Sequence, residues 1–295
     1  MTSSSSAAIG ASMEAIQSHY DLSNDFYHLW LDPETKCYSA ALWEPGDTFV
    51  EAQLRKLDYH IEQSGSRNGA NVLDIGCGWG GTLKRLVHSY GVSRAVGLTL
   101  SDAQKDYVEQ LELPGVDVRL ENWQDHTPAA KYSAIISIGA FEHFANLEQT
   151  AEEKILGYRQ FFKRCHDWLE NSGKLSLQTI TYENATREDF SPFFAKEIFP
   201  ESDLPRLYEI AQACDGLFEI QCIRNDREHY YLTQKAWWQG LKNNKKAICT
   251  TYGATIFQRY NTYLQMCMVG FKSGTMGLAR LTLKRIDHPA ASLKD

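Results

Sequence analysis

The stretch Val72-Leu73-Asp74-Ile75-Gly76-Cys77-Gly78-Trp79-Gly80-Gly81 decides the fold. Its apolar start, followed by a turn rich in glycine, is typical of a buried strand that leads into a helix. Gly76 and Gly78 lack a Cβ atom, so their backbone can adopt positive φ and a ligand can lie directly against it. The helix expected at residues 82–90 would aim its N-terminal N–H groups at that ligand. The sequence therefore predicts a nucleotide-cofactor loop, in which Cys77 also contacts the cofactor.

The residues after the next strand favour S-adenosylmethionine over NAD as that cofactor. Gly76, Gly78 and Gly81 have the G-x-G-x-x-G spacing, which suits NAD as well. A dinucleotide enzyme usually carries an acidic residue about 20 residues beyond the loop, where it holds the ribose. Here the strand expected at residues 94–98 ends in Thr99-Leu100-Ser101. We expect these three residues to contact the cofactor, and a glycine-rich turn without a ligand is the alternative.

Other residues are expected at the same edge of the sheet. Asp74 lies just before the turn, where the methionine ammonium group or its bound water would sit. Gln104 is on the helix that follows Ser101. Asn122 and Trp123 close a further strand, and Trp123 is expected to cover the adenine. Ile138 ends an apolar strand at the carboxyl edge, where open α/β sheets bind ligands.

Strands and helices alternate along the chain, which predicts an α/β fold with a doubly wound, mostly parallel, seven-stranded sheet. Residues 1–12 are expected to be disordered, and residues 13–295 are expected to form a single domain. That domain is divided into four parts, which are a helical N-terminal cap at 13–66, a cofactor-binding core at 67–180, a hydrophobic lid insertion at 181–214, and closing strands with substrate-covering helices at 215–295.

Composition limits the classes of partner. With 43% hydrophobic and 23% charged residues, the 295-residue chain is expected to be globular. Its net charge of −7 argues against nucleic acid and against broad docking on anionic lipid. No apolar run reaches the roughly 18 residues of a membrane span, and residues 1–12 lack the features of a secretory signal. The seven scattered cysteines read as reduced thiols, and no cluster has metal-ligand spacing. We expect a cytoplasmic protein without a metal, and leave a homo-oligomer open.

Five segments carry more specific motifs, namely Tyr20–Tyr27, Asp74–Gly80, Gly97–Ser101, Ile138–Phe144 and Glu197–Pro200. Together they resemble the cyclopropane-fatty-acid synthase family of methyltransferases, and among its members the mycolic acid cyclopropane synthases. The resemblance extends from about Tyr20 to Met268. It implies a Rossmann-like class I methyltransferase fold, S-adenosylmethionine as the cofactor, and cofactor contacts from Tyr38 and Ser39.

Glu142 is the residue expected to carry catalysis. It follows an apolar strand in a turn of small residues, where a carboxylate has no structural reason to be; a helix N-cap or first-turn charge is the alternative. A methyl sulfonium is already activated, so the enzyme mainly aligns an acceptor within about 3–3.5 Å. Transfer to an alkene leaves a carbocation, which a carboxylate and aromatic rings can stabilise. The 15 Tyr, 13 Phe and 7 Trp of this chain suit such an acceptor.

The resemblance implies that the glutamate helps to hold a bicarbonate that acts as the base. The backbone at Ala40, a histidine and Tyr230 would complete that site. This chain departs from the pattern, because the histidine position is occupied by Gln178, which cannot carry a proton away. The following insertion is also shorter than in the fatty-acyl enzymes. We therefore expect a smaller apolar acceptor, such as a prenyl or terpenoid group.

The expected function is an S-adenosylmethionine-dependent C-methyltransferase that methylates an alkene of a small hydrophobic natural product. The carbocation would then be deprotonated or cyclised. A cyclopropane synthase for unsaturated fatty acyl lipids, a catalytically silent cofactor-binding module and a nicotinamide oxidoreductase are the alternatives. His143 and His229 are candidate general bases, with structural hydrogen-bonded histidines as the alternative for each.

Overall fold

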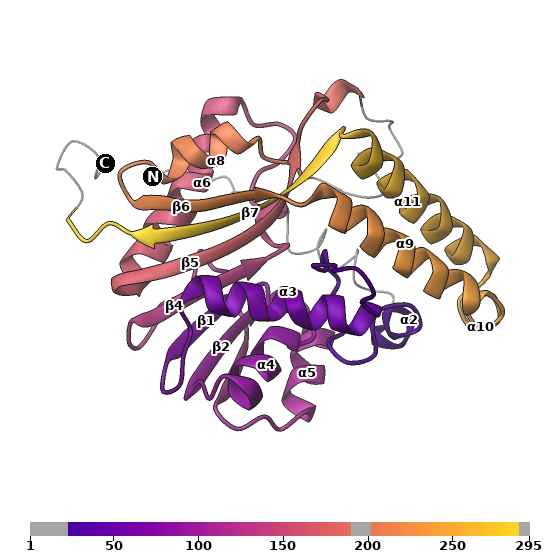
Figure 1. Cartoon of the computed structure of the whole chain (residues 1–295), viewed down its shortest axis with the longest axis horizontal. Helices are drawn as coiled ribbons and strands as arrows, with labels where there is room; N and C mark the ends of the chain where they lie inside the picture. Colours follow the sequence, from indigo (N-terminus) through magenta and orange to yellow (C-terminus); the bar gives the residue numbers. More distant parts are fainter. Residues whose placement is uncertain (1–22, 190–201, 289–295) are drawn as a thin grey trace, which may run out of the picture.

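The computed structural model describes residues 23–189 and 202–288. Within this part, seven strands form one sheet in the order β3-β2-β1-β4-β5-β7-β6 (Figure 1). The strands are β1 (Asn71–Ile75), β2 (Arg94–Thr99), β3 (Val116–Leu120), β4 (Tyr132–Ile138), β5 (Leu169–Tyr182), β6 (Phe218–Asn225) and β7 (Met276–Arg285). The pairs from β3 to β5 are parallel, and β7 is antiparallel to both of its neighbours. The predicted doubly wound, mostly parallel sheet is confirmed.

Helices cover both faces of the sheet. The side chains of α3 (Phe49–Ser64), α4 (Gly81–Ser89) and α5 (Asp102–Gln110) form a core with one face of the strands. On the other face lie α6 (Ala151–Trp168) and α8 (Leu207–Cys214), which pack against each other. A capping box of Thr48 and Glu51 fixes the start of α3, which runs across the sheet in Figure 1.

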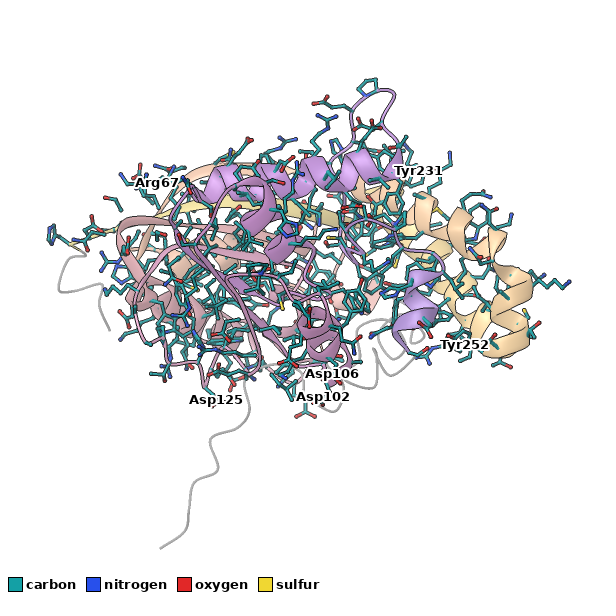
Figure 2. The ribbon with its side chains drawn as sticks, turned by 90° about the horizontal axis from the view of Figure 1, so that it is seen from below. Arg67, Asp102, Asp106, Asp125, Tyr231 and Tyr252 are labelled. Atoms are coloured by element: carbon teal, nitrogen blue, oxygen red, sulfur yellow. The ribbon has the colours of Figure 1, made fainter. Side chains whose placement is uncertain are left out.

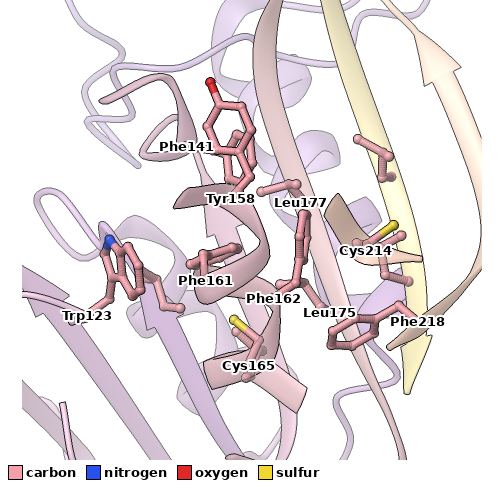
Figure 3. Packing of buried hydrophobic residues seen from close by; sticks show 14 of the residues in the cluster. Trp123, Phe141, Tyr158, Phe161, Phe162, Cys165, Leu175, Leu177, Cys214 and Phe218 are labelled. Atoms are coloured by element: carbon pink, nitrogen blue, oxygen red, sulfur yellow. The ribbon is translucent and has the colours of Figure 1, made fainter. Parts of the chain in front are cut away.

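The core between the sheet and the helices α6 and α8, here called the larger core, also positions the turn that follows β4. This turn is the one-turn 3₁₀ helix η1 (Phe141–His143), and its Phe141 is fully buried against α6 (Figure 3). The ring of Phe141 stacks on that of Tyr158, with 4.5 Å between the ring centroids. Because aromatic pairs of this kind bury a large apolar area, they fix the orientation of η1. Glu142, next along the chain, is thereby held against β5.

An aromatic core, separate from the two cores on the faces of the sheet, lies beyond the carboxyl edge of the sheet. It is built by α2 (Asn24–His28), α9 (Arg227–Asn243), α10 (Lys245–Thr251) and α11 (Ala254–Ser273), which project to one side in Figure 1. Tyr252 lies where α2 meets the C-terminal helices, with its ring 5.3 Å from that of Phe26 (Figure 2). We call the side chains that form this whole aromatic core the aromatic cluster. Within the described ranges, no helix has the length and apolar character needed to cross a membrane.

Some details differ from the sequence-based expectation. The pattern of Asn171–Gly173 indicates the end of a helix, with the next strand from Lys174, whereas β5 already begins at Leu169 and includes these residues, with Ser172 at φ 59°. The helix α8 falls in the predicted lid range, yet its Ile210, Ala213 and Cys214 are buried in the larger core. Residues 1–22, the central part of the lid at 190–201, and residues 289–295 lie outside the described residues, so the expected disorder of residues 1–12 stays a prediction.

Candidate active site

The glycine loop turns sharply between β1 and α4. The backbone N–H groups of Gly76 and Cys77 both donate to the carbonyl of Leu98, which ties the loop to β2. Gly76 has φ 81°, and a Cβ atom there would lie 2.7 Å from the Cβ of Ala140. Gly78 has φ 55°, and no atom lies within 4 Å of the place where its Cβ would stand. Gly76 is therefore required by packing, whereas Gly78 leaves its surface open.

The open surface faces two cavities, of about 120 Å³ and about 60 Å³, which share walls at Gly76, Gly78, Gln104 and Gly139. Predicted cofactor residues line both. The larger cavity is lined by Thr99, Leu100, Asn122 and Trp123, and the smaller one by Tyr38, Ser39, Asp74, Cys77 and Ile138. The N-terminal cap, the glycine loop and the ends of β2, β3 and β4 thus meet at one elongated site, as the sequence predicts for the carboxyl edge of the sheet.

Ser101 is the predicted cofactor residue that lines neither cavity. Its hydroxyl oxygen accepts a hydrogen bond from the backbone N–H of Gln104 at 3.3 Å and caps α5. Thr99 donates to Oε1 of Gln104 at 2.7 Å, which fixes the glutamine side chain between the two cavities. The pattern Thr99-Leu100-Ser101 therefore identified this edge of the sheet, although the hydroxyl of Ser101 caps α5 and does not line a cavity.

Asp74 is a buried carboxylate at the wall of the smaller cavity. Its side chain is 1% exposed, and no hydrogen-bond partner for its Oδ2 atom exists among the described residues. Burial raises the pKa of Asp74 to about 7, against the opposing influence of the Thr82 hydroxyl and the positive charge of Lys56. A buried carboxylate with an unpaired oxygen is suited to receive a cationic or hydrogen-bond-donating group.

Glu142 is also buried, at 4% exposure, between the larger cavity and β5. Its neighbours Ala140 and His143 line that cavity, while its Oε1 atom accepts a hydrogen bond from the backbone N–H of Ile180 at 2.9 Å. The Oε2 atom is buried and has no partner in the described part of the chain. Burial raises the pKa of Glu142 to about 7. Glu142 does lie in the single turn of η1, as the first-turn alternative supposes, but its carboxylate bonds to β5 and does not cap a helix.

Two of the three other predicted catalytic side chains, those of His143 and Tyr230, occupy different surroundings. His143 donates or accepts through Nδ1 with the Ser202 hydroxyl at 2.8 Å, and burial lowers its pKa to about 4. It is therefore a weak base at neutral pH, placed on the wall of the larger cavity. Tyr230 belongs to the aromatic cluster, where its ring stacks on Phe271 with centroids 4.4 Å apart.

Gln178 is the acceptor in a fully buried polar network. Its Oε1 atom accepts from Nε of Arg280 at 2.8 Å and lies 3.2 Å from Nε2 of His60. Nδ1 of His60 lies 2.8 Å from the hydroxyl of Ser176, which supplies the other hydrogen bond of the imidazole. The carbonyl end of the glutamine thus serves the network.

The guanidinium of Arg280 extends this network to the N-terminal cap. It forms an ion pair with Asp226 at the start of α9 and donates from Nη2 to the carbonyls of Ala40 and Ala41 at 3.2 and 3.0 Å. Ala40 is the residue whose backbone the family resemblance assigns to the reaction site. His229, the other histidine considered as a base, accepts through Nδ1 from the backbone N–H of Trp43, so it has a structural contact.

Sequence reasoning missed several polar residues of the site. Gln53, Lys56 and His60 all point inward from α3 and are completely buried, and Lys56 lines the smaller cavity. Their spacing places them on one face of the helix. Polar residues on the face of a helix that packs against the sheet could have indicated site residues from the sequence alone. Glu121, at the end of β3, is a further charged residue in the wall of the larger cavity.

Comparison with known proteins identifies the family. Residues 9–281 match the family model described as mycolic acid cyclopropane synthetase. The chain belongs to the mycolic acid cyclopropane synthetase family. One similar member is cyclopropane mycolic acid synthase 3 of Mycobacterium tuberculosis, which is 34% identical over 289 residues, covering 92% of this chain and 96% of that protein.

Solved structures agree with the family assignment. The cyclopropane synthase MmaA2 from Mycobacterium tuberculosis and the synthase CmaA1 complexed with SAH and CTAB each superpose with a TM-score of 0.83 at 32% identity, over 94% of this chain and 99% of theirs. The geranyl diphosphate C-methyltransferase from Streptomyces coelicolor, with a TM-score of 0.63 at 16% identity over 93% of this chain and 97% of its own, shares the fold.

This member of the cyclopropane synthetase family is an S-adenosylmethionine-dependent methyltransferase. Its residues fit the cofactor. The open face of Gly78 leaves room for a ligand against the backbone, and the unpaired oxygen of Asp74 offers an acceptor for an ammonium group. The prediction of S-adenosylmethionine in place of NAD is confirmed, and the comparisons do not support the prediction of a terpenoid acceptor.

Proposed function

We propose that this enzyme transfers the methyl group of S-adenosylmethionine to an alkene carbon of an unsaturated acyl chain, and that the product closes to a cyclopropane. The observation that carries the proposal is Glu142, a buried carboxylate whose neighbours Ala140 and His143 line the larger cavity and whose Oε2 atom has no hydrogen-bond partner among the described residues. Its family setting supports an acyl acceptor, because several similar relatives are named cyclopropane mycolic acid synthases or cyclopropane synthases.

The aromatic cluster offers an apolar surface next to the cofactor site. Tyr38 and Trp79 line the smaller cavity and also pack in the aromatic cluster, so the two features are continuous. Binding of an apolar chain to such a surface is favourable, by about 0.8 kcal/mol for each CH₂ group that is buried from water. CTAB, which is bound in the CmaA1 structure, is an amphiphile with one long alkyl chain, which agrees with an acceptor of this kind.

The cofactor supplies an activated methyl group. The alkene π electrons form the new C–C bond while the S–CH₃ bond breaks toward sulfur, and the second alkene carbon becomes a cation. Loss of a proton from the transferred methyl group lets its C–H electron pair close the ring. We assign that proton to the carboxylate of Glu142, whose raised pKa of about 7 makes it a stronger base than an exposed glutamate.

Gln178 bears on which group is the base. Its acceptor oxygen is already engaged by Arg280 and His60, and an amide does not titrate near neutral pH. Glu142 is therefore a titratable group that can take the proton where the family resemblance implies a histidine. The proposal keeps the acyl acceptor of the alternative hypothesis and drops the prenyl group.

The test uses S-adenosylmethionine with a fully deuterated methyl group and vesicles of dioleoyl phosphatidylcholine. A cyclopropane product keeps two of the three deuterium atoms, since one leaves with the proton transfer. A methylated alkene keeps all three, because the proton is lost from the chain. Mass spectrometry of the fatty acids reads this difference directly. Methylation of a prenyl alcohol offered in parallel, with none of the acyl chain, would overturn the proposal.

A further inference from the structure

Lys56 is a buried cation without a carboxylate partner. It lies in the middle of α3 with 0% exposure, and within the described part of the chain no acidic oxygen lies within 4 Å of its ammonium group. Its Nζ atom donates a hydrogen bond to the hydroxyl of Ser39, at 3.1 Å, and also lies near the thiol of Cys37. Removing a charged amine from water costs several kcal/mol unless an opposite charge compensates it.

The same cavity holds a charge of the opposite sign. Asp74 and Lys56 both line the smaller cavity, and Asp74 also has an oxygen without a partner among the described residues. The positive charge of Lys56 lowers the pKa of Asp74, so the two groups interact across the cavity although they form no ion pair. The lining of the cavity therefore includes the negative group of Asp74 and the buried positive group of Lys56, besides the partly exposed Lys36, whose Nζ atom donates to the carbonyl of Pro33 at 3.3 Å.

A zwitterion is the ligand that satisfies both groups at once. The methionine end of the cofactor is an amino acid, with a carboxylate and an ammonium group on the same carbon atom. We infer that the Lys56 ammonium, together with the Ser39 hydroxyl, binds the carboxylate of the cofactor while Asp74 receives its ammonium group. The role of Lys56 is thus recognition of the cofactor, in a position that the glycine-loop motif does not include.

Holding the backbone in place is the competing role for Lys56. The segment Thr35–Ser39, here called the strap, lies over the smaller cavity, and Lys56 could serve only to hold it. Gln53 provides a matched control, because it also holds the strap from α3. Its Nε2 atom donates to the carbonyls of Ser39 and Cys37 at 3.1 and 3.5 Å, and its side chain carries no charge. Gln53 does not line the smaller cavity, so its loss affects only the strap.

The experiment measures calorimetric affinities of the full chain for SAH and for decarboxylated SAH, which keeps the ammonium group. Lys56→Met should weaken SAH binding by about tenfold or more, as expected for a lost charge-assisted hydrogen bond. The same variant should change the affinity for decarboxylated SAH by less than about threefold. Gln53→Met should alter both affinities by the same factor, because it perturbs the strap and not the carboxylate contact.

Lys56→Arg and Lys56→Gln complete the set. The arginine variant keeps the charge and should retain a preference for SAH over the decarboxylated ligand. The glutamine variant should lose that preference, and it provides the test if Lys56→Met does not fold. Equal weakening of both ligands by Lys56→Gln would show that the lysine only anchors the strap. Unchanged SAH binding in that variant would also overturn the inference.

Discussion

Nε of Arg280 donates a hydrogen bond to Oε1 of Gln178 at 2.8 Å, across the antiparallel pair of β5 and β7 in which these two residues are direct partners. The same oxygen lies within 3.2 Å of the His60 imidazole. An amide oxygen has two lone pairs, so it can accept from both neighbours. Glutamine at this position is thus matched to a buried cation and a buried imidazole, neither of which is visible in the local sequence.

Gln178→His is therefore expected to damage the network without improving catalysis. The imidazole has at most one acceptor nitrogen, so it cannot accept from both Arg280 and His60 as the amide oxygen does. An unsatisfied buried donor costs about 1–3 kcal/mol, which corresponds to a decrease in Tm of roughly 2–5 °C for a chain of this size. Scanning calorimetry and turnover of the same variant check this. An unchanged Tm together with faster turnover would contradict it.

Glu142→Gln should separate catalysis from binding. The variant keeps the size of the side chain and its hydrogen bond from the Ile180 N–H, but loses the charge and the basicity. We expect kcat to fall by at least ~10²-fold, because one base or charge-stabilising group is lost. The affinity for SAH should change by less than about threefold. Single-turnover rates and calorimetry test both statements, and a normal rate with a lowered Tm would assign Glu142 a structural role.

The stability of the unliganded protein should depend on pH through Glu142. Its ordinary pKa is 4.5, and burial raises it to about 7 in the folded state. Between these values the folded protein binds more protons than the unfolded chain, so stability is greatest at low pH and falls as the pH rises to about 7. Thermal unfolding from pH 5 to 8 should show this decrease for the wild type. Glu142→Gln should have a flatter profile, and an identical slope would refute the assignment.

The affinity for SAH should depend on pH through Asp74. Its pKa is about 7, and an ammonium group bound beside the carboxylate favours the charged form. Binding then releases a proton below that pH, so the dissociation constant should rise by up to about tenfold for each pH unit as the pH falls below 7. Asp74→Asn should bind more weakly and independently of pH. Calorimetry at pH 6 and pH 8 distinguishes the two proteins.

Gly78→Val should remove cofactor binding and leave the fold intact. Its side chain would meet no protein atom within 4 Å at Cβ, so it would enter the space that the cofactor occupies. Gly65→Val is a matched control, since Gly65 has φ 75°, equally open surroundings, and a position at the end of α3 outside both cavity walls. Both variants should lose similar stability from positive φ, at about 1–2 kcal/mol. Only Gly78→Val should fail to bind SAH in calorimetry.

The sequence was sufficient to predict the sheet and the edge at which the expected cofactor residues meet, because these depend on local patterns. Asp74, the next-to-last residue of β1, and Thr99, which ends β2, both lie near strand ends, which parallel order brings to one edge. Lys56 and Arg280 could not be found in this way. Lys56 is a charged residue in an amphipathic helix, and Arg280 is a charged residue in a strand. The burial of such residues depends on partners far away in the chain, such as Ala40 for Arg280.

The link between Arg280 and the carbonyls of Ala40 and Ala41 also affects the order in which the protein can mature. The two ends of this contact are 240 residues apart. At translation rates of roughly 5–20 residues per second, β7 is synthesised roughly 10–50 s after the cap. A nascent chain that lacks β7 has no guanidinium to hold the residues next to Tyr38 and Ser39, so the wall of the cofactor cavity is completed only after β7 has been synthesised. Recognition of the cofactor is in this sense a test of whether β7 is in place.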